Sequence, residues 1–377
     1  YLLRHSGARH LAWDGVLPLP DLDGVTLFTP DDIARMKRAA PGGYADTAAD
    51  DPAYLIFTSG TSGTPKGVLH AQRAIWGRRP MYQGWYGIGP DDVMLHTGAF
   101  NWTYTLGTGL CDPFANAATS VVYTGERDTS VWARLIAEHG VTIMASVPGI
   151  YRQVLREGFH PGSTLRHGLT AGEALARPIL DGWRQQTGLE LYEALGMSEI
   201  STYISSSPSV PVRPGSPGKP QPGRSVTILE NGQLGVHRTD PGLLLRYWGE
   251  EPLEGEWFAT GDTAEIDADG YVWYHGRGDD LMNAGGFRVS PLEVENVLLQ
   301  HPAVAEAGVR EWKVSDTASI IAAFVVPQAG VSPNEAVLQA FVSDRLAAYK
   351  CPKQFWFVPA LPRTANGKLI RKALEKP

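Results

Sequence analysis

A run of glycine, serine and threonine at residues 58–67, TSGTSGTPKG, has the residue types of a phosphate-binding loop. Its glycines can adopt positive φ angles and turn backbone N–H groups inward, while the hydroxyls and Lys66 add donors and a positive charge. The run follows the apolar segment 54–57, which favours a loop after a strand over a flexible linker. Pro65 stands where a Walker A loop would need its Gly-Lys-Ser/Thr ending. The sequence therefore predicts a polyphosphate cradle of another kind.

These ten residues closely resemble the phosphate-loop motif of the adenylate-forming superfamily, which includes acyl-CoA synthetases, luciferases and the adenylation domains of peptide synthetases. The resemblance implies that ATP activates a carboxylate as an acyl-adenylate and that the acyl group then passes to a thiol. The residues of this loop that the resemblance assigns to ATP binding are Thr58, Ser59, Gly60, Thr61, Ser62, Gly63, Thr64 and Lys66.

A second motif, ALGMSE at residues 194–199, follows the predicted strand 189–193 and matches the superfamily's next signature. By resemblance, Ser198 contacts the α-phosphate and Glu199 ligates Mg²⁺, a hard cation that suits carboxylate and phosphate oxygens. Both are then catalytic residues. Read alone, the hexapeptide is a plain surface turn, but its distance behind the phosphate loop favours function. Gly172, Glu173 and Ala174 resemble the segment that lies against adenine.

Two motifs resemble the ribose site and the domain hinge of the superfamily. The segment TGD at 260–262 is similar to the motif whose aspartate accepts both ribose hydroxyls, which implies that role for Asp262. The segment GRGDD at 276–280 resembles the hinge, where Arg277 contacts the nucleotide and Asp279 is the pivot. Its glycines lower the torsional penalty of a large change in φ and ψ.

The last motifs concern the thiol and the catalytic lysine. The segment PRTANGK at 362–368 resembles the superfamily's closing motif, which implies that Lys368 is catalytic rather than a solvated surface lysine. Relatives place the glycine that matches Gly286 along the pantetheine channel. Gly285 and Arg288 belong to the same motif, although Arg288 is equally explained by a structural ion pair.

The acyl group should be uncharged and larger than acetate, with medium-chain and aryl acids favoured. In acetate-specific relatives a tryptophan at the position of Gly196 forms the floor of the pocket, so an open floor is expected here. Amino-acid-activating relatives use an aspartate where Asn101 stands, and an amide cannot neutralise a buried ammonium. The aromatic residues involved are also explained as ordinary core. The expected pocket comprises Phe100, Trp102, Tyr104, Ala194, Leu195 and Gly196.

The amino-acid composition limits the kinds of molecule that this protein is expected to bind. The 377 residues carry a net charge of −7, so no broad basic face and no nucleic-acid partner are expected. Two cysteines are too few for a disulfide framework, and no apolar run is long enough for a membrane span. The sequence predicts a cytoplasmic enzyme that acts on a small-molecule carboxylic acid. A homo-oligomer is compatible with these features.

The pattern of elements indicates an α/β fold. Helices are predicted at 130–139, 150–157 and 175–187, and they alternate with strands in an order that favours a mostly parallel sheet. Ligands of such sheets bind beyond the carboxyl ends of the strands, where the loops after Phe57 and Glu193 are expected to lie.

Two domains are predicted within this fold. The segment 1–278 would be the large core domain with a β-rich subdomain, and 279–377 a small mobile mixed α/β domain that carries the catalytic lysine. Relatives have a long segment before the phosphate loop, and most of it is expected to be absent here. Capping boxes at 290–293 and 332–335 predict two helix starts in the small domain.

The leading hypothesis is an ATP-dependent acid:CoA ligase that uses ATP, Mg²⁺ and coenzyme A. An adenylating enzyme that loads a separate carrier protein is an alternative within the superfamily. An inactive nucleotide-binding or scaffold protein is an alternative of another class.

Overall fold

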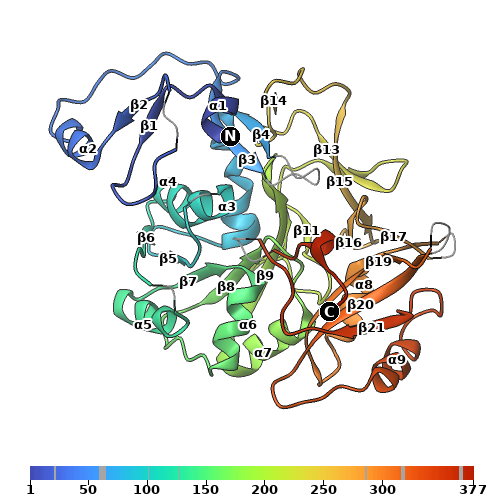
Figure 1. Cartoon of the computed structure of the whole chain (residues 1–377). Coiled ribbons are helices and arrows are strands. Elements are labelled where there is room, and N and C mark those ends of the chain that lie inside the picture. The colour runs from blue at the N-terminus through green and yellow to red at the C-terminus, as the bar shows by residue number, and fades with distance from the viewer. Residues whose placement is uncertain are drawn as a thin grey trace. The chain divides into compact units, whose positions relative to one another are not determined.

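The computed structural model describes residues 1–20, 23–58, 65–100, 102–126, 128–284, 287–315, 319–364 and 368–377. It is a mixed α/β structure (Figure 1), which confirms the predicted fold class. The chain forms two compact units, Tyr1–Trp76 with Pro241–Leu253, and Gly77–Asp240 with Glu254–Pro377. The domain boundary predicted after residue 278 lies inside the second unit and stays a prediction.

The first unit contains two small sheets. Its elements are α1 (Leu2–Ser6), β1 (His10–Ala12), β2 (Thr26–Phe28), α2 (Pro30–Met36), β3 (Pro52–Thr58), β4 (Lys66–Ala71), a 3₁₀ turn (Gln72–Ala74) and β14 (Arg246–Tyr247). Strands β3 and β4 form an antiparallel hairpin, and β14 pairs with β4. The expectation that the loop after Phe57 ends a strand of the parallel sheet is therefore wrong.

A seven-stranded sheet dominates the second unit, in the order β11-β10-β9-β8-β7-β5-β6. Its strands are β5 (Val93–His96), β6 (Thr119–Val121), β7 (Ile143–Ser146), β8 (His167–Ala171), β9 (Glu190–Met197), β10 (Ser201–Ser205) and β11 (Lys219–Pro220). The pairs from β6 to β9 are parallel, as predicted. The pairs of β10 with β9 and β11 are antiparallel.

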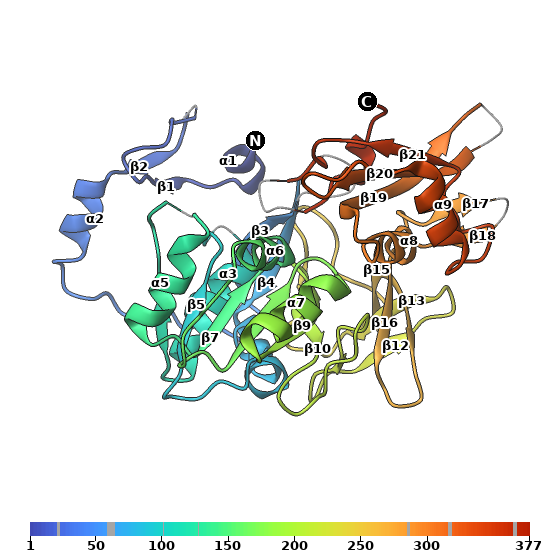
Figure 2. The same ribbon diagram turned by 90° about the horizontal axis from the view of Figure 1, so that it is seen from below.

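Helices cover both faces of this sheet. On one face lie α5 (Ser130–His139), α6 (Pro148–Arg156) and α7 (Arg177–Thr187), and Figure 2 shows α6 and α7 side by side. The other face packs on the π-helical turns Tyr82–Tyr86 and Gly107–Cys111, with α3 (Thr103–Leu106) and α4 (Asp112–Ala115) between and after them. Helices α5 and α7 end at His139 and Thr187, as predicted, and each is followed by a glycine in the left-handed conformation, Gly140 and Gly188.

The β-rich part contains an antiparallel sheet of β12 (Val226–Ile228), β13 (Gln233–His237), β15 (Trp257–Ile266) and β16 (Val272–Arg277). After it come β17 (Met282–Ala284), β18 (Phe287–Val289), α8 (Pro291–Leu298), β19 (Val304–Lys313), β20 (Ser319–Pro327), α9 (Glu335–Ser343), β21 (Gln354–Phe357) and a 3₁₀ turn (Arg371–Ala373). Ser290 caps α8 as predicted, whereas α9 is capped by Asn334 instead of Ser332. Within the described ranges, no helix is long and apolar enough to cross a membrane.

Candidate active site

The signature residues Ser198 and Glu199 lie in the turn between β9 and β10. The predicted loop after residue 193 is wrong in one respect, because β9 continues to Met197 and only residues 198–200 form the turn. Gly196 is required here, since a methyl group at this position would lie 2.5 Å from the carbonyl oxygen of Ser201. A larger side chain at 196 would therefore separate the two strands. The turn is thus held by main-chain contact.

A buried ion pair between Arg78 and Asp112 holds the end of the same turn. Arg78 donates to both carboxylate oxygens of Asp112, at 2.8 and 2.6 Å, and to the hydroxyl of Ser201 at 2.6 Å. Ser201 has a φ of 70°, a strained value for a residue with a side chain. Tyr86 donates a further hydrogen bond to Asp112. These residues, which the sequence reasoning missed, fix the backbone immediately after Glu199.

Asp262 and Arg277 are register partners on β15 and β16. Asp262 is 4% exposed as a residue. Its carboxylate lies 3.7 Å from Nη1 of Arg277, and the Tyr274 hydroxyl donates to it at 3.4 Å. Burial raises the pKa of Asp262 to about 6, while Arg277 and Lys368 counteract part of that rise. The structure therefore brings two predicted nucleotide residues together, with Tyr274 as a neighbour that the sequence reasoning missed.

Glu199 belongs to the same electrostatic group. Its charge raises the pKa of Asp262 and of Arg277, although in each case more weakly than burial or nearer charges act. Tyr203, fully buried on β10, lies among them, and its pKa is raised first by burial and then by the charge of Asp262. The alternation of β10 could have indicated Tyr203, because it stands two residues after Ser201 on a strand that leaves the motif.

The predicted adenine segment follows β8 directly. Gly172 has a φ of 97°, and a methyl group there would approach the ring of Trp102 to 3.4 Å. The backbone N–H of Leu175 donates to the carboxylate of Glu193 at 2.8 Å. Burial raises the pKa of Glu193 to about 7, against the effect of that hydrogen bond. Glu193, a residue without a motif, therefore fixes this segment to β9.

The closing segment forms a narrow hairpin around Lys368. Arg363 and Leu369 pair across it, the N–H of Thr364 donates to the carbonyl of Lys368 at 2.8 Å, and the N–H of Lys368 donates to the Thr364 hydroxyl. Residues 365–367 lie outside the described residues. The positive charge of Lys368 lowers the pKa of Asp262. The predicted catalytic lysine thus acts on the predicted ribose aspartate.

The expected acyl residues fall into two groups. Tyr104 is buried in the core, donates to the carbonyl of Ser146 at 3.0 Å, and packs edge-on against His96 and Trp102. Trp102 is partly buried beside Gly172, and Phe100 lies near Gly109. Ala194, Leu195 and Gly196 all lie on β9. The polar atoms of Trp102 and Tyr104 bond within the protein, and only Trp102 keeps a partly exposed ring.

The phosphate-loop prediction falls largely outside the described residues, because 59–64 are not among them. Thr58 and Lys66 pair as the last and first residues of β3 and β4. Lys66 lies 3.5 Å from Glu250 and over the ring of Tyr247. Gly67 is packed against Trp248, since a methyl group there would lie 2.9 Å from its Cβ. A glycine at 67 is therefore needed for packing as well as for any loop function.

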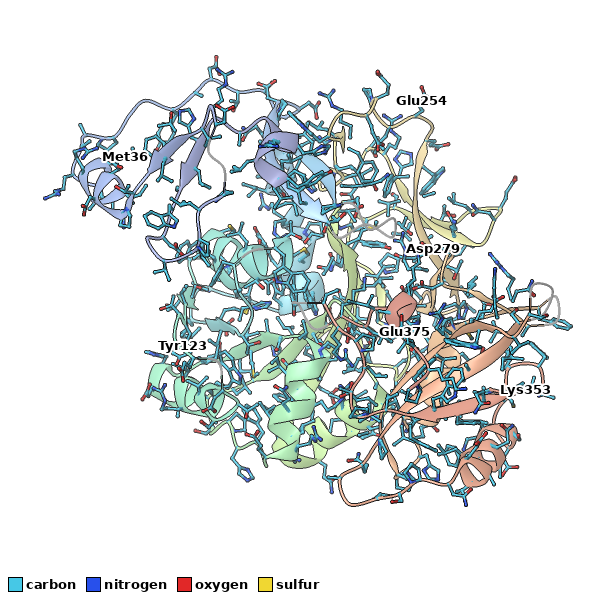
Figure 3. All side chains as sticks on the ribbon, in the orientation of Figure 1. Met36, Tyr123, Glu254, Asp279, Lys353 and Glu375 are labelled. Atoms are coloured by element: carbon cyan, nitrogen blue, oxygen red, sulfur yellow. The ribbon has the colours of Figure 1, made fainter. Side chains whose placement is uncertain are left out.

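The hinge and thiol residues are partly described. Asp279 follows β16 (Figure 3) and lies 3.6 Å from Nε of Arg277. Gly285 and Gly286 lie outside the described residues. Arg288 is exposed, and its Nη2 donates to the carbonyl of Gly278 at 3.5 Å. Both readings of Arg288, as part of the thiol motif and as a structural ion pair, stay predictions.

The residues around Glu199 fit a magnesium ion that is held partly by the substrate. Among the described residues there is no cluster of three or more histidine, cysteine or carboxylate side chains that could hold a metal. Mg²⁺ is commonly held through one or two carboxylates together with substrate phosphates. A single buried carboxylate, Glu199, beside a nucleotide site meets that requirement.

Comparison with known proteins identifies the family. A model of the AMP-binding enzyme family matches residues 13–246, and a model of the AMP-binding enzyme C-terminal domain matches residues 293–368. The chain therefore belongs to the AMP-binding enzyme family, which confirms the resemblance found in the sequence.

Individual relatives agree with this placement. An uncharacterized acyl-CoA ligase, YtcI, from Bacillus subtilis is 31% identical over 354 residues, covering 88% of this chain and 67% of that protein. The acetyl-coenzyme A synthetase of the same bacterium is also 31% identical, and the chain spans 60% of its length.

Solved structures show the same fold. A benzoate CoA ligase from Burkholderia xenovorans is 29% identical with a TM-score of 0.85, covering 99% of this chain and 80% of that one. The o-succinylbenzoate coenzyme A synthetase of Bacillus subtilis, solved with ATP and magnesium, is 28% identical with the same TM-score and the same coverage. These likenesses confirm the adenylate-forming fold, with its large N-terminal and smaller C-terminal domains.

Proposed function

We propose that this protein is an AMP-forming acid:CoA ligase that activates a carboxylic acid as its acyl-adenylate and transfers the acyl group to coenzyme A. The observation that carries the proposal is the convergence of Glu199, Asp262, Arg277 and Lys368, whose charges act on one another although they come from four separate segments. A buried aspartate with a raised pKa that faces an arginine is typical of functional sites.

Each of these residues has a task in the first half-reaction. Asp262 accepts hydrogen bonds from the ribose hydroxyls, and its carboxylate must be ionised to accept both. Arg277 and Lys368 place positive charge where negative charge develops during attack on the α-phosphate. Mg²⁺, when bound at Glu199, supplies further neutralisation of the phosphate oxygens. The buried setting strengthens all of these interactions because water screens them less.

The acid substrate that we propose is aryl or medium-chain. Trp102 is only partly buried and donates its indole N–H to Thr105 within the protein, which leaves apolar ring surface for an acyl group. Each methylene buried there contributes about 0.8 kcal/mol. The benzoate and o-succinylbenzoate ligases among the relatives support an aryl group. An acetyl-coenzyme A synthetase is also a relative, so acetate belongs in any substrate test.

The structure changes the interpretation of Gly196, which the sequence suggested as the open floor of the acyl pocket. A tryptophan at this position cannot be accommodated, because the main chain of Ser201 and Thr202 occupies the space beside it. Substituting tryptophan would therefore disrupt the hairpin and would not test pocket size. The space beside Gly196 is filled by backbone, so the preference for an acid larger than acetate rests on the aromatic residues and the relatives and not on this position.

A pyrophosphate–ATP exchange assay over a panel of acids tests the proposal. Exchange should be strongest with benzoate-type or medium-chain acids, weaker with acetate and absent with α-amino acids. Glu199→Gln should abolish most of the exchange, while Glu138→Gln, an exposed residue on α5, should not change it. A protein that exchanges with no acid would be the nucleotide-binding scaffold instead. Preference for acetate would contradict the substrate assignment alone.

The thiol acceptor is tested separately. After adenylation, addition of free coenzyme A should release the thioester and AMP in equal amounts. Exchange without thioester formation would identify the carrier-loading alternative.

We also propose a cytoplasmic location. The cysteines at 111 and 351 are both free in the structure, which supports this location.

A further inference from the structure

One carboxylate holds both arms of the hairpin that carries Lys368. Oε1 of Glu173 accepts from the backbone N–H of Leu369 at 3.1 Å and from Nη1 of Arg363 at 3.4 Å. Arg363 and Leu369 are the paired residues on the two arms. Because Leu369 immediately follows Lys368, a bond to its N–H fixes the backbone directly beside the lysine.

This hairpin needs an external anchor. Its internal bonds join Thr364 to Lys368 and the N–H of Ile370 to the carbonyl of Pro362. These bonds set the shape of the hairpin but not its position against the nucleotide residues. Lys368 itself is exposed, so side-chain packing does not hold it. The contacts with Glu173 supply a positional constraint from the segment after β8.

Glu173 is part of a chain of alternating charges. Arg363 also donates to Glu306 on β19 at 2.6 Å, and Glu306 lies 3.7 Å from Arg152 on α6. All four side chains are only 23–26% exposed. Burial lowers the pKa of Arg152, and the charge of Glu306 opposes that effect. Arg363 therefore links the hairpin directly to Glu173 after β8 and, through Glu306, indirectly to Arg152 on α6.

We propose that Glu173 is a positioning residue for Lys368, and that it acts in the adenylation half-reaction through the closing hairpin. The sequence resemblance assigned Glu173 to adenine, whereas the structure shows its carboxylate bound to Leu369 and Arg363. The inference rests on the proposed function, because Lys368 has its catalytic role only there. Thioester formation, which does not need Lys368 at the phosphate, should not need this clamp.

Half-reaction kinetics of Glu173→Ala test the inference. Adenylation should slow by about ten- to hundredfold, the change expected when a charge-assisted hydrogen bond is lost. Thioester formation from preformed acyl-adenylate should keep its rate or increase. Glu173→Gln should lose less, since its amide oxygen still accepts from the N–H of Leu369. This second variant also keeps the test valid if the alanine variant folds poorly.

A double-mutant cycle with Lys368→Ala separates positioning from an independent adenine contact. If Glu173 works through the lysine, its removal should cost less than threefold in the Lys368→Ala background, because the lysine is no longer there to be positioned. If Glu173 contacts adenine independently, the two losses should multiply and the KM for ATP should rise. That result would overturn the inference.

The same cycle distinguishes the inference from the proposed function. An unchanged adenylation rate in Lys368→Ala would refute the role of the lysine itself, whatever Glu173 does. A large loss in Lys368→Ala together with full additivity would refute only the positioning role. Glu138→Ala, which breaks an exposed Glu–Arg pair on α5, is the matched control and should leave both half-reactions unchanged.

Discussion

Replacing Asp262 by asparagine should make the protein more stable and less able to bind ATP. The unfolded chain ionises this carboxyl near its ordinary pKa of 3.8, whereas burial in the folded protein raises the pKa to about 6. At about 1.4 kcal/mol per tenfold change in proton affinity, the ionised carboxylate costs the folded state on the order of 3 kcal/mol above pH 6. Asparagine keeps the shape of the aspartate side chain and an oxygen that accepts from Tyr274. It carries no charge, so the cost of burying an ionised carboxylate is removed.

The predicted gain depends on pH in a defined direction. Between pH 3.8 and about 6 the folded protein holds a proton that the unfolded chain has released, so wild-type stability falls as the pH rises through this range. The variant has no such proton to lose. Its advantage should therefore be largest above pH 6 and should shrink as the pH falls towards 3.8.

Thermal unfolding of both proteins at several pH values measures this difference. An unfolding entropy of roughly 2 cal/mol/K per residue converts the full effect into a rise in Tm of about 4 °C at pH 7.5. ATP binding, followed by calorimetry, should weaken in the same variant, because a neutral amide replaces the acceptor of the ribose hydroxyls. Stability without ATP and affinity for ATP should thus change in opposite directions.

Asp240→Asn provides a matched control with the opposite expectation. Asp240 is also buried, but it accepts directly from Nη1 of Arg224 at 2.6 Å, and both side chains are almost fully covered. Its removal leaves a buried guanidinium uncompensated and should cost about 3–5 kcal/mol. If Asp262→Asn lowers the Tm as Asp240→Asn does, or if its effect does not change with pH, the reasoning from burial is wrong.

Three other substitutions test separate parts of the site. Lys368→Ala should slow acyl-adenylate formation by about 10²–10³-fold, with little change in thioester formation from preformed adenylate; equal losses in both steps, measured by rapid quench, would contradict its assignment. Asp279→Pro should lower multiple-turnover rates while ATP affinity stays nearly constant, because proline restricts the proposed hinge, and unchanged turnover would show that the pivot lies elsewhere. Gly196→Ala should lower the Tm and the magnesium-dependent exchange together, because its methyl group would meet Ser201 at 2.5 Å; a variant with wild-type values of both would show that β10 yields easily.

Local patterns predicted local structure well. The helix ends at residues 139 and 187 were predicted correctly, and each precedes a left-handed glycine, a C-cap that depends only on the residue next to the helix. The alternation of strands and helices likewise predicted the parallel pairs from β6 to β9. Asp262 and Arg277 were each predicted to contact the nucleotide, from two separate motifs, and only the structure shows them paired across a ladder.

Contacts between distant segments could not be predicted in this way. The apolar run 54–57 reads as a strand in any sheet, and only the structure shows that it pairs with β4. Arg78 and Asp112 are 34 residues apart and follow no motif, so nothing in the sequence marks them as partners. The role of Glu173 was transferred from relatives, and that transfer could not indicate its bonds to Arg363 and Leu369.

Asp262 and Arg277 come together only when β15 and β16 pair in the correct register. Activity therefore depends on the accurate folding of this hairpin. Strands β15 and β16 are joined by a tight turn around Gly270, and their register shifts between Thr263 and Ala264. A slip by one residue would turn Asp262 outwards while the backbone bonds of the sheet re-formed elsewhere. Such a misfolded species would keep most of its secondary structure and still lack the ribose site. Some preparations of the protein could have a normal circular dichroism spectrum and a low fraction of active molecules. In such preparations, the rates of amide hydrogen exchange in β15 and β16 should be measured to detect the slipped register.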